Sequence, residues 1–137
     1  MKKIFYALII FFIIPIIGHA SEKVDLYLFW GDGCPHCAHE KEYLEGLEKK
    51  YDNLNVHLYE VWYNEDNAKK MEKLKKSFSD EATLSVPFTV IGEKSFSGYS
   101  DQIGSEIKAE IHKCQKKKCD NVAEKILTGS NIKDEKK

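Results

Sequence analysis

The sequence contains no arginine: all 21 basic residues are lysines, and the 137 residues carry a formal net charge of −1. Domains that bind nucleic acids or anionic membranes usually concentrate positive charge on one face, and this composition gives no sign of such a face. We therefore expect no nucleic-acid partner and interpret the lysines as solvated faces of helices. The chain also lacks an internal repeat and a separating linker, which predicts one domain.

A long hydrophobic run is missing as well. The uncharged segment 4–17 has fourteen residues, too few at about 1.5 Å each to cross a hydrocarbon core of roughly 30 Å, and Pro15 would interrupt the helix. The segment follows a basic start, and small residues at Gly18 and Ala20 precede a possible cleavage site without cysteine. This layout predicts a signal peptide at 1–20, cleaved after Ala20, and a periplasmic or secreted protein. An uncleaved segment would tether the protein to a membrane.

Cleavage would leave a mature domain with a formal charge of −3, because residues 1–20 contain two lysines and no acid. Export also changes how the cysteines are interpreted, since thiols outside the cytosol usually become paired. Their spacing groups them as Cys34 with Cys37 and Cys114 with Cys119, although four cysteines permit three pairings.

Hydrophobic patterns predict the order β-α-β-α-β-β-α with a short C-terminal helix. The strands are expected at 24–30, 56–63 and 85–92, the last followed by a hairpin partner within 94–99. Pro35 suits the first turn of a helix, and Asn64, Ser100 and Asp120 are predicted caps of the later helices. We expect a four-stranded mixed sheet with helices on both faces at 21–130, and a flexible polar tail at 131–137.

In this arrangement Cys34 lies at the N-terminus of a helix. Unpaired backbone N–H groups and the positive end of the helix dipole favour a thiolate, so its pKa should fall below the free value of about 8.5. His36 would act in the same direction. Cys37 lies one turn further on the apolar face, so an exposed sulfur and a shielded partner are expected.

These motifs resemble the thioredoxin superfamily over about residues 23–113. Phe29 and Trp30 precede the C-x-x-C pair, Val86-Pro87 precedes a strand, and Gly98-Tyr99 follows the hairpin. The resemblance implies a thioredoxin-like α/β fold and catalytic roles for Cys34 and Cys37. It also implies that Val86 and the cis proline Pro87 face the cysteine pair and contact the substrate peptide.

The dipeptide Pro35-His36 makes the motif C-P-H-C, as in DsbA-like periplasmic oxidants, where the resemblance implies that it tunes the reduced thiolate. A stabilised thiolate is a good leaving group, which favours oxidation of the substrate. Three features depart from that pattern. Only 49 residues separate Cys37 from Pro87, Leu28 replaces a buried acid, and Gly33 replaces an aromatic residue. The proton acceptor of Cys37 is therefore open among Asp25, Glu40 and water.

Alternatives to redox chemistry exist for both cysteine pairs. All four cysteines could hold a structural zinc ion, with His36 and His39 as further candidates, or the domain could be a non-catalytic interaction module. Cys114 and Cys119 are expected to form a structural disulfide, which requires the helix to break around 116–118, because five positions on a helix span about 7.5 Å. A catalytic relay pair is the alternative. We expect His39 and His57 at the surface and Trp30 and Trp62 in the core or at its rim.

The sequence therefore predicts an exported thiol–disulfide oxidoreductase acting on protein substrates in the oxidising direction. A thioredoxin-like reductase or isomerase, for example of apocytochromes, is the alternative. We expect no cofactor and no metal, a membrane redox partner for recycling, and a monomer.

Overall fold

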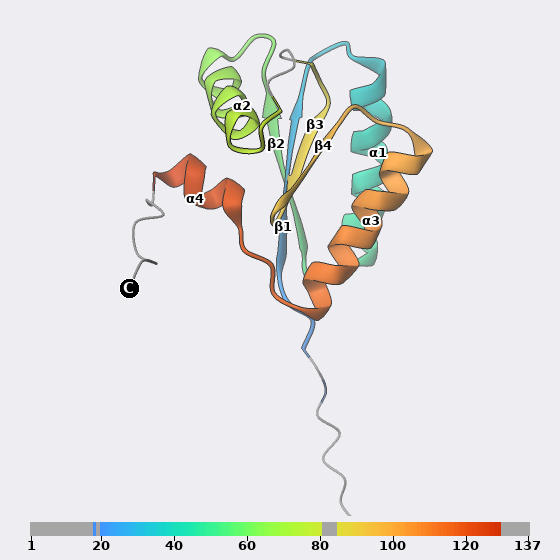
Figure 1. Cartoon of the computed structure of the whole chain (residues 1–137). Coiled ribbons are helices and arrows are strands. Elements are labelled where there is room, and N and C mark those ends of the chain that lie inside the picture. The colour runs from blue at the N-terminus through green and yellow to red at the C-terminus, as the bar shows by residue number, and fades with distance from the viewer. Residues whose placement is uncertain (1–17, 19, 81–84, 130–137) are drawn as a thin grey trace, which may run out of the picture.

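The computed structural model describes residues 18, 20–80 and 85–129 (Figure 1). The predicted signal peptide, apart from Gly18 and Ala20, and the predicted tail 131–137 lie outside the described residues. Within the described ranges the elements follow the predicted order. They are β1 (Val24–Trp30), α1 (Pro35–Lys50), β2 (Leu54–Glu60), α2 (Glu65–Ser77), β3 (Phe88–Ile91), β4 (Lys94–Ser97), α3 (Asp101–Lys116) and α4 (Val122–Thr128). No helix in this part of the chain has the length and apolar character needed to cross a membrane.

The strands form one mixed sheet in the order β2-β1-β3-β4. β1 runs parallel to β2, so that Trp30 lies opposite Glu60 at the carboxyl ends of both strands. β3 is antiparallel to both β1 and β4, and the hairpin between β3 and β4 turns at Gly92, whose φ is 56°. A parallel β-α-β start followed by an antiparallel hairpin is the thioredoxin-like α/β fold that the sequence predicts.

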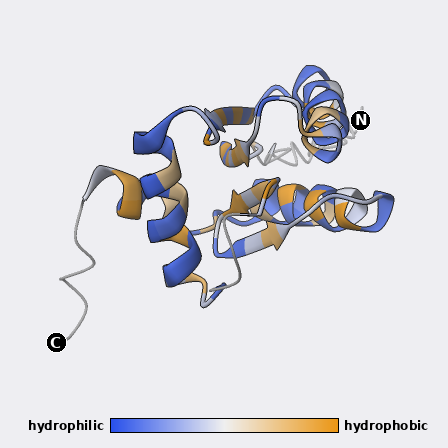
Figure 2. Ribbon diagram, turned by 90° about the horizontal axis from the view of Figure 1, so that it is seen from above, coloured by the Kyte–Doolittle hydropathy of each residue, from blue (hydrophilic) through white to orange (hydrophobic). Residues whose placement is uncertain are grey.

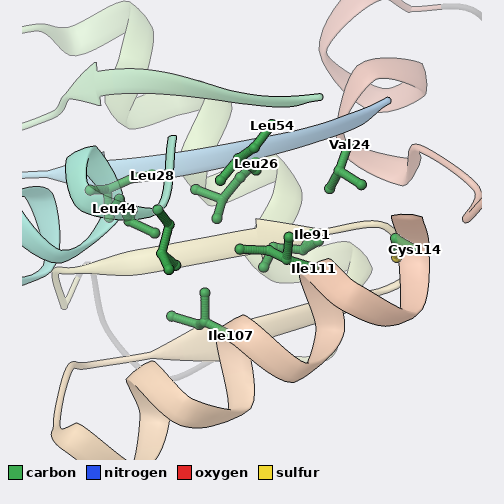
Figure 3. Packing of buried hydrophobic residues seen from close by; sticks show 10 residues of the cluster. Val24, Leu26, Leu28, Leu44, Leu54, Ile91, Ile107, Ile111 and Cys114 are labelled. Carbon is green, nitrogen blue, oxygen red and sulfur yellow. The ribbon is translucent and has the colours of Figure 1, made fainter. Parts of the chain in front are cut away.

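One face of the sheet is covered by α1 and α3. Alternate residues of β1 point to this face, and Leu26 and Leu28 pack there with Leu44 of α1 and Ile107 and Ile111 of α3 (Figure 3). The alternation follows from the two-residue period of a strand. This cluster holds α1 against the sheet and thereby fixes the position of the N-terminus of α1 relative to β1.

The opposite face is covered by α2 and α4, which lie across the sheet from α1 and α3 (Figure 1). Tyr27 and Phe29 of β1 pack here with Met71 and Leu74 of α2 and Ala123 of α4. Figure 2 shows hydrophilic and hydrophobic residues alternating along the helices, as expected where one side of each helix is buried. Helices therefore cover both faces of the sheet, as predicted.

Three predicted boundaries are wrong. β2 begins at Leu54 and ends at Glu60 rather than spanning 56–63, because the Glu60 carboxylate accepts hydrogen bonds from the backbone N–H groups that follow it. β3 begins after Pro87, which has no N–H to donate to the sheet. The cap of α4 is Asn121, not Asp120.

The reason for the shifted cap is geometric. The Asn121 side chain accepts a hydrogen bond from the backbone N–H of Glu124, three residues later, at 3.1 Å. Asp120 lies one residue too early for that contact and forms an ion pair with Lys125 instead. The predicted caps Asn64 and Ser100 are confirmed, since their side chains accept from the N–H groups of Asn67 and Ile103.

Candidate active site

Cys34 lies just beyond the carboxyl end of the central strand β1, at the end of the sheet shown at the top of Figure 1. Gly31, Asp32 and Gly33 connect it to the strand, and Gly33 has a φ of 84°, which favours glycine. The backbone N–H of Cys34 donates to the Gly31 carbonyl at 3.1 Å, closing this turn. Cys34 and Cys37 form a disulfide with a Cα–Cα distance of 5.3 Å.

The Cys34 sulfur occupies the N-cap position of α1. Its Sγ accepts a hydrogen bond from the backbone N–H of Cys37 at 3.2 Å, and Pro35 takes the first helical position. The first turn consists of Pro35, His36, Cys37 and Ala38, so no carboxylate opposes the positive end of the helix dipole there. Once the disulfide is reduced, this environment favours the anionic form of the Cys34 sulfur.

The two cysteines differ in accessibility, although less than predicted. Cys34 is 8% exposed and Cys37 only 1%, so the expectation of an exposed first sulfur is wrong, while the expectation that Cys37 is the more shielded of the two is confirmed. A cavity of about 280 Å³ opens beside Cys34 and is lined by both Gly31 and Pro35. The side chains of His36 and His39 are exposed.

Val86 and Pro87 lie at the same end of the sheet as Cys34. The peptide bond between them is cis, and the Pro87 carbonyl accepts the Gly98 N–H at 2.8 Å. Phe88 is the antiparallel partner of Phe29, so Val86 and Pro87, which directly precede Phe88, lie near the carboxyl end of β1, and Val86 packs against the cluster that contains Phe29. The structure thus brings the predicted substrate-contacting pair to the end of the sheet at which Cys34 lies.

Glu40 is the acidic group of this region. It lies three residues after Cys37 on the buried face of α1, where side chains so spaced are neighbours, and it is fully buried. Thr89 of β3 donates a hydrogen bond to Oε1 at 2.5 Å, whereas Oε2 finds no partner among the described residues. Burial raises the pKa of Glu40 to about 7, although the hydrogen bond from Thr89 opposes the rise.

Asp25, another proton acceptor considered for Cys37, lies elsewhere. It stands near the start of β1, five residues before Trp30, which is about 17 Å along a strand. Its carboxylate contacts His57 Nε2 at 2.9 Å and the amide of Asn55. The predicted surface position of His57 is confirmed in part: the imidazole is partly exposed but stacks on Tyr27. Glu40 is therefore the acid that the fold brings close to Cys37.

Glu60 was not predicted as a site residue. Its carboxylate accepts hydrogen bonds from the backbone N–H groups of Asp32, Trp62 and Tyr63 at 3.3, 2.9 and 3.0 Å. Partial desolvation acts to raise the pKa of Glu60, but these hydrogen bonds, with one from Asn64, hold it below its ordinary value. The contact joins the Cys34 loop to the loop after β2, and a lone glutamate at the end of a strand gives no sequence signal for it.

Cys114 and Cys119 form a second disulfide, with a Cα–Cα distance of 5.0 Å. The predicted helix break is confirmed, because α3 ends at Lys116 and the chain leaves the helical conformation at Lys117. A Cβ on Gly92 would lie 2.8 Å from the Cys119 Cβ, so this disulfide packs against the turn between β3 and β4. The pair joins the end of α3 to the segment before α4.

The two disulfides lie at opposite ends of the sheet. Cys34 follows the carboxyl end of β1, whereas the Gly92 turn lies at its amino end because β3 runs antiparallel. A strand of seven residues is about 23 Å long. The four sulfurs of the described structure therefore cannot share one zinc ion, and the two pairs cannot exchange electrons directly within one molecule.

No protein-family model and no curated protein matches the chain. Among solved structures, the chain is similar to mitochondrial thioredoxin 3 of Saccharomyces cerevisiae, with 14% identity over 68% of this chain and 80% of that chain and a TM-score of 0.47. It is similar to a glutaredoxin of Archaeoglobus fulgidus, with 27% identity over 64% and 86% and a TM-score of 0.44. It is also similar to the thioredoxin domain of a thiol–disulfide oxidoreductase of Bacteroides vulgatus, with 14% identity over 69% and 84% and a TM-score of 0.42. The chain itself has a thioredoxin-like fold that carries a C-x-x-C disulfide at the start of α1.

Proposed function

We propose that the protein is an exported thiol–disulfide oxidoreductase that oxidises protein thiols through the Cys34–Cys37 disulfide. The observation that carries the proposal is the asymmetry of this pair. The Cys34 sulfur caps α1 and accepts the Cys37 N–H, while Cys37 lies shielded behind it. A sulfur held in this way is both the point of attack and a good leaving group.

In the first step a substrate thiolate attacks Sγ of Cys34. The Cys34–Cys37 bond breaks, its electron pair passes to the Cys37 sulfur, and a mixed disulfide joins Cys34 to the substrate. A second substrate thiolate then attacks the substrate sulfur of this mixed disulfide. Cys34 leaves as a thiolate stabilised by the N-terminus of α1. The substrate has passed two electrons to the protein, its two thiol protons were released to solvent when the attacking thiolates formed, and the Cys37 sulfur takes up one proton.

Glu40 donates a proton to the Cys37 sulfur in the oxidising direction and accepts it in the reverse direction. When the Cys37 sulfur leaves in the first step it needs a proton, and a carboxyl with a pKa of about 7 is partly protonated near neutral pH. In the reverse direction the carboxylate accepts that proton. Glu40 suits the task because it shares the buried face of α1 with Cys37 and keeps one oxygen without a partner among the described residues.

The remaining predicted site residues have supporting roles. Pro35 starts the helix, and the exposed His36 stabilises the Cys34 thiolate by a hydrogen bond or by its positive charge. The backbone at Val86 and Pro87 lies at the same end of the sheet as Cys34, where an extended substrate segment can align along it. The chemistry needs no cofactor, only protein thiol substrates and a membrane redox partner that reoxidises the pair.

Export is proposed on the N-terminal sequence pattern, with cleavage after Ala20 and release of a monomeric domain into the periplasm or medium. The cysteine pairing is consistent with an oxidising compartment. Fractionation of the producing cells and N-terminal sequencing of the mature protein test this point. A first residue of Ser21 supports the proposal, and a retained Met1 on a membrane-bound protein would instead support a tethered form.

A reductase or isomerase is the second candidate, favoured by the compact connection between the active-site loop and Pro87. Only β2 and α2 occupy the described part of this connection, which leaves little surface for a separate substrate groove. The reduction potential of the Cys34–Cys37 couple against glutathione separates the candidates. A value near −120 mV supports the oxidant, and a value near −270 mV supports the reductase.

Two cysteine variants test the proposed chemistry itself. Cys34→Ser should abolish oxidation of a dithiol peptide, because no sulfur remains for the substrate to attack. When Cys37→Ser is mixed with a protein disulfide, the Cys34 thiol should form mixed disulfides that persist, because the sulfur that would release them is gone. Mass spectrometry under non-reducing conditions measures both outcomes. Wild-type turnover in both variants would show that the domain is not an oxidoreductase of this type and would favour a non-catalytic module.

A further inference from the structure

Large apolar side chains are exposed mainly beside the candidate active site. Among the described residues they are Leu58, Trp62 and Tyr63, which are 47%, 51% and 82% exposed. Trp62 and Tyr63 are consecutive and follow the carboxyl end of β2, the end of the sheet at which Cys34 lies. We call these two residues the aromatic platform.

Trp62 of the aromatic platform touches the Cys34 loop directly. Val61 continues the pairing of β2 with β1 by donating its N–H to the Trp30 carbonyl at 2.9 Å, which brings the next residue level with Gly31. A Cβ built on Gly31 would lie 2.2 Å from Cδ2 of the Trp62 indole, so the ring lies flat against this glycine. Gly31 also lines the cavity that reaches Cys34. Gly31 therefore contacts Trp62 and also lines the cavity beside Cys34, although neither residue of the platform lines that cavity.

The platform is also held in place. The Glu60 carboxylate bonds the backbone N–H groups of Trp62 and Tyr63 and, from the other side, that of Asp32. Three hydrogen bonds to one charged group fix the two loops relative to each other. A surface that is already ordered loses little conformational entropy when a ligand binds, which is what a docking site requires.

The charges around the platform are negative. Asp32 is exposed in the Cys34 loop, Glu65 and Asp66 are exposed in the first turn of α2, and the segment 60–66 contains acidic residues but no lysine. The cations described near this end of the sheet contact other rings: Lys41, which lines the cavity beside Cys34, lies over Trp30 at 3.6 Å, and Lys70 lies over Tyr59 at 5.3 Å. Exposed aromatic rings surrounded by carboxylates are complementary to an apolar side chain with a basic neighbour.

We propose that the aromatic platform is the specificity-determining part of the substrate site. It binds an extended protein segment in which an apolar or aromatic side chain, followed by lysine or arginine, lies close to the reacting cysteine. β3 flanks β1 on the side opposite β2, so the segment before β3, with Val86 and Pro87, and the platform after β2 lie on opposite sides of the end of β1, and the bound segment would cross Cys34 between them. The inference rests on the proposed oxidoreductase function and names the class of substrate.

The test uses matched peptides of ten residues, each with two cysteine thiols. One carries Phe-Lys after the first cysteine, the second carries Ala-Lys, and the third carries Phe-Glu. Each is mixed with the oxidised full-length protein, and the peptide disulfide is quantified after acid quenching by mass spectrometry. Because the Phe-Lys and Ala-Lys peptides share their thiols, their charges and every chemical step, the ratio of these two rates reports the side-chain contact. The Phe-Glu peptide also differs in thiol pKa and is therefore compared between wild type and Trp62→Ala.

For the wild type we expect the Phe-Lys peptide to be oxidised roughly two to ten times faster than the Ala-Lys peptide, the range for one aromatic contact. Trp62→Ala should bring this ratio close to one, and Trp62→Phe should keep most of it. Gly31→Ala offers a second variant, because its methyl group displaces the indole without removing it. Leu58→Ala is the matched control, an exposed apolar residue on β2 outside the platform, and should keep the wild-type ratio.

The Phe-Glu peptide should react more slowly than Phe-Lys at low salt, by a larger factor in the wild type than in Trp62→Ala, and the gap should narrow at 0.5 M salt as charges are screened. Equal wild-type rates for the Phe-Lys and Ala-Lys peptides, or an unchanged preference in Trp62→Ala, would overturn the docking inference while leaving the oxidoreductase function intact. A failure of the wild type to oxidise any of the three peptides would instead overturn the proposed function, and the inference with it.

Discussion

Replacing Glu40 by glutamine should make the protein more stable at alkaline pH and slower as an enzyme. Glutamine keeps the size of the side chain and an oxygen that can accept the Thr89 hydroxyl, but it never carries the charge that burial disfavours. The variant therefore isolates the consequence of placing an ionisable group in the interior beside Cys37.

The magnitude follows from the pKa of Glu40. Burial raises it from an ordinary value of 4.5 to about 7, so the folded protein binds this proton more tightly than the unfolded chain does. The resulting stabilisation is fully present below pH 4.5 and is lost as the pH rises through about 7. A change of this size corresponds to about 3 kcal/mol. Glu40→Gln should thus unfold like the wild type near pH 4.5 and be more stable by about 3 kcal/mol at pH 8.

Urea denaturation of the disulfide-intact protein at pH 5, 6, 7 and 8 measures this difference. Glu45→Gln, an exposed carboxylate on the same helix, is the control and should change the free energy of unfolding by a few tenths of a kcal/mol at each pH. The same preparations should oxidise dithiol peptides more slowly when Glu40 is glutamine, because the Cys37 sulfur loses its proton source. A stability difference that stays constant from pH 5 to 8 would refute the assignment of Glu40 as a buried, titrating acid.

Two further predictions concern groups that support the fold around the two disulfides. Thr89→Val removes the hydrogen bond that stabilises the buried Glu40 carboxylate, so it should raise the pKa of Glu40 further and cost about 1–3 kcal/mol, with the larger loss at pH 8. Denaturation at pH 5 and pH 8 measures it, and an equal loss at both values would contradict the argument. Replacing both Cys114 and Cys119 by serine opens a loop of six residues and should lower the free energy of unfolding by about 2 kcal/mol. Peptide oxidation should persist in this double variant, because the pair lies at the end of the sheet opposite Cys34. Loss of turnover in a variant that remains folded would favour the catalytic relay alternative.

Much of the fold could be predicted because its signals are local. The β1 run VDLYLFW is apolar enough to be buried on both faces, and the structure buries it between α1 and α3 on one side and α2 and α4 on the other. Caps such as Asn64 and Ser100 act on N–H groups three residues away, so their effect is contained in a short stretch of sequence. The Cys34–Cys37 pair is equally local, since α1 itself brings the two sulfurs together.

The predicted cap of α4 and the predicted end of β2 are wrong because adjacent residues in the sequence are compatible with the same structural role. Both Asp120 and Asn121 can cap a helix, and only the position at which α4 begins selects Asn121. The sequence VHLYEVWY predicts a strand that ends at residue 63, three residues after the observed end of β2, because its last residues are as apolar and aromatic as the strand itself. The strand ends earlier because the Glu60 carboxylate accepts hydrogen bonds from the backbone N–H groups of Trp62 and Tyr63, which are then not paired with another strand.

The order of the elements and the C-x-x-C pair at a helix start follow from the amino-acid sequence, because each depends on residues within a few positions of one another, whereas the cysteine spacing favours one of three pairings and the fold selects it. Only the tertiary structure decided that Glu40 meets Thr89, 49 residues away, and that Trp62 lies on Gly31. The physical reason is that desolvation and ring packing depend on which surfaces the folded sheet and helices bring together. One glutamate thereby becomes an internal acid with a pKa of about 7, while another becomes the hydrogen-bond acceptor that joins two loops.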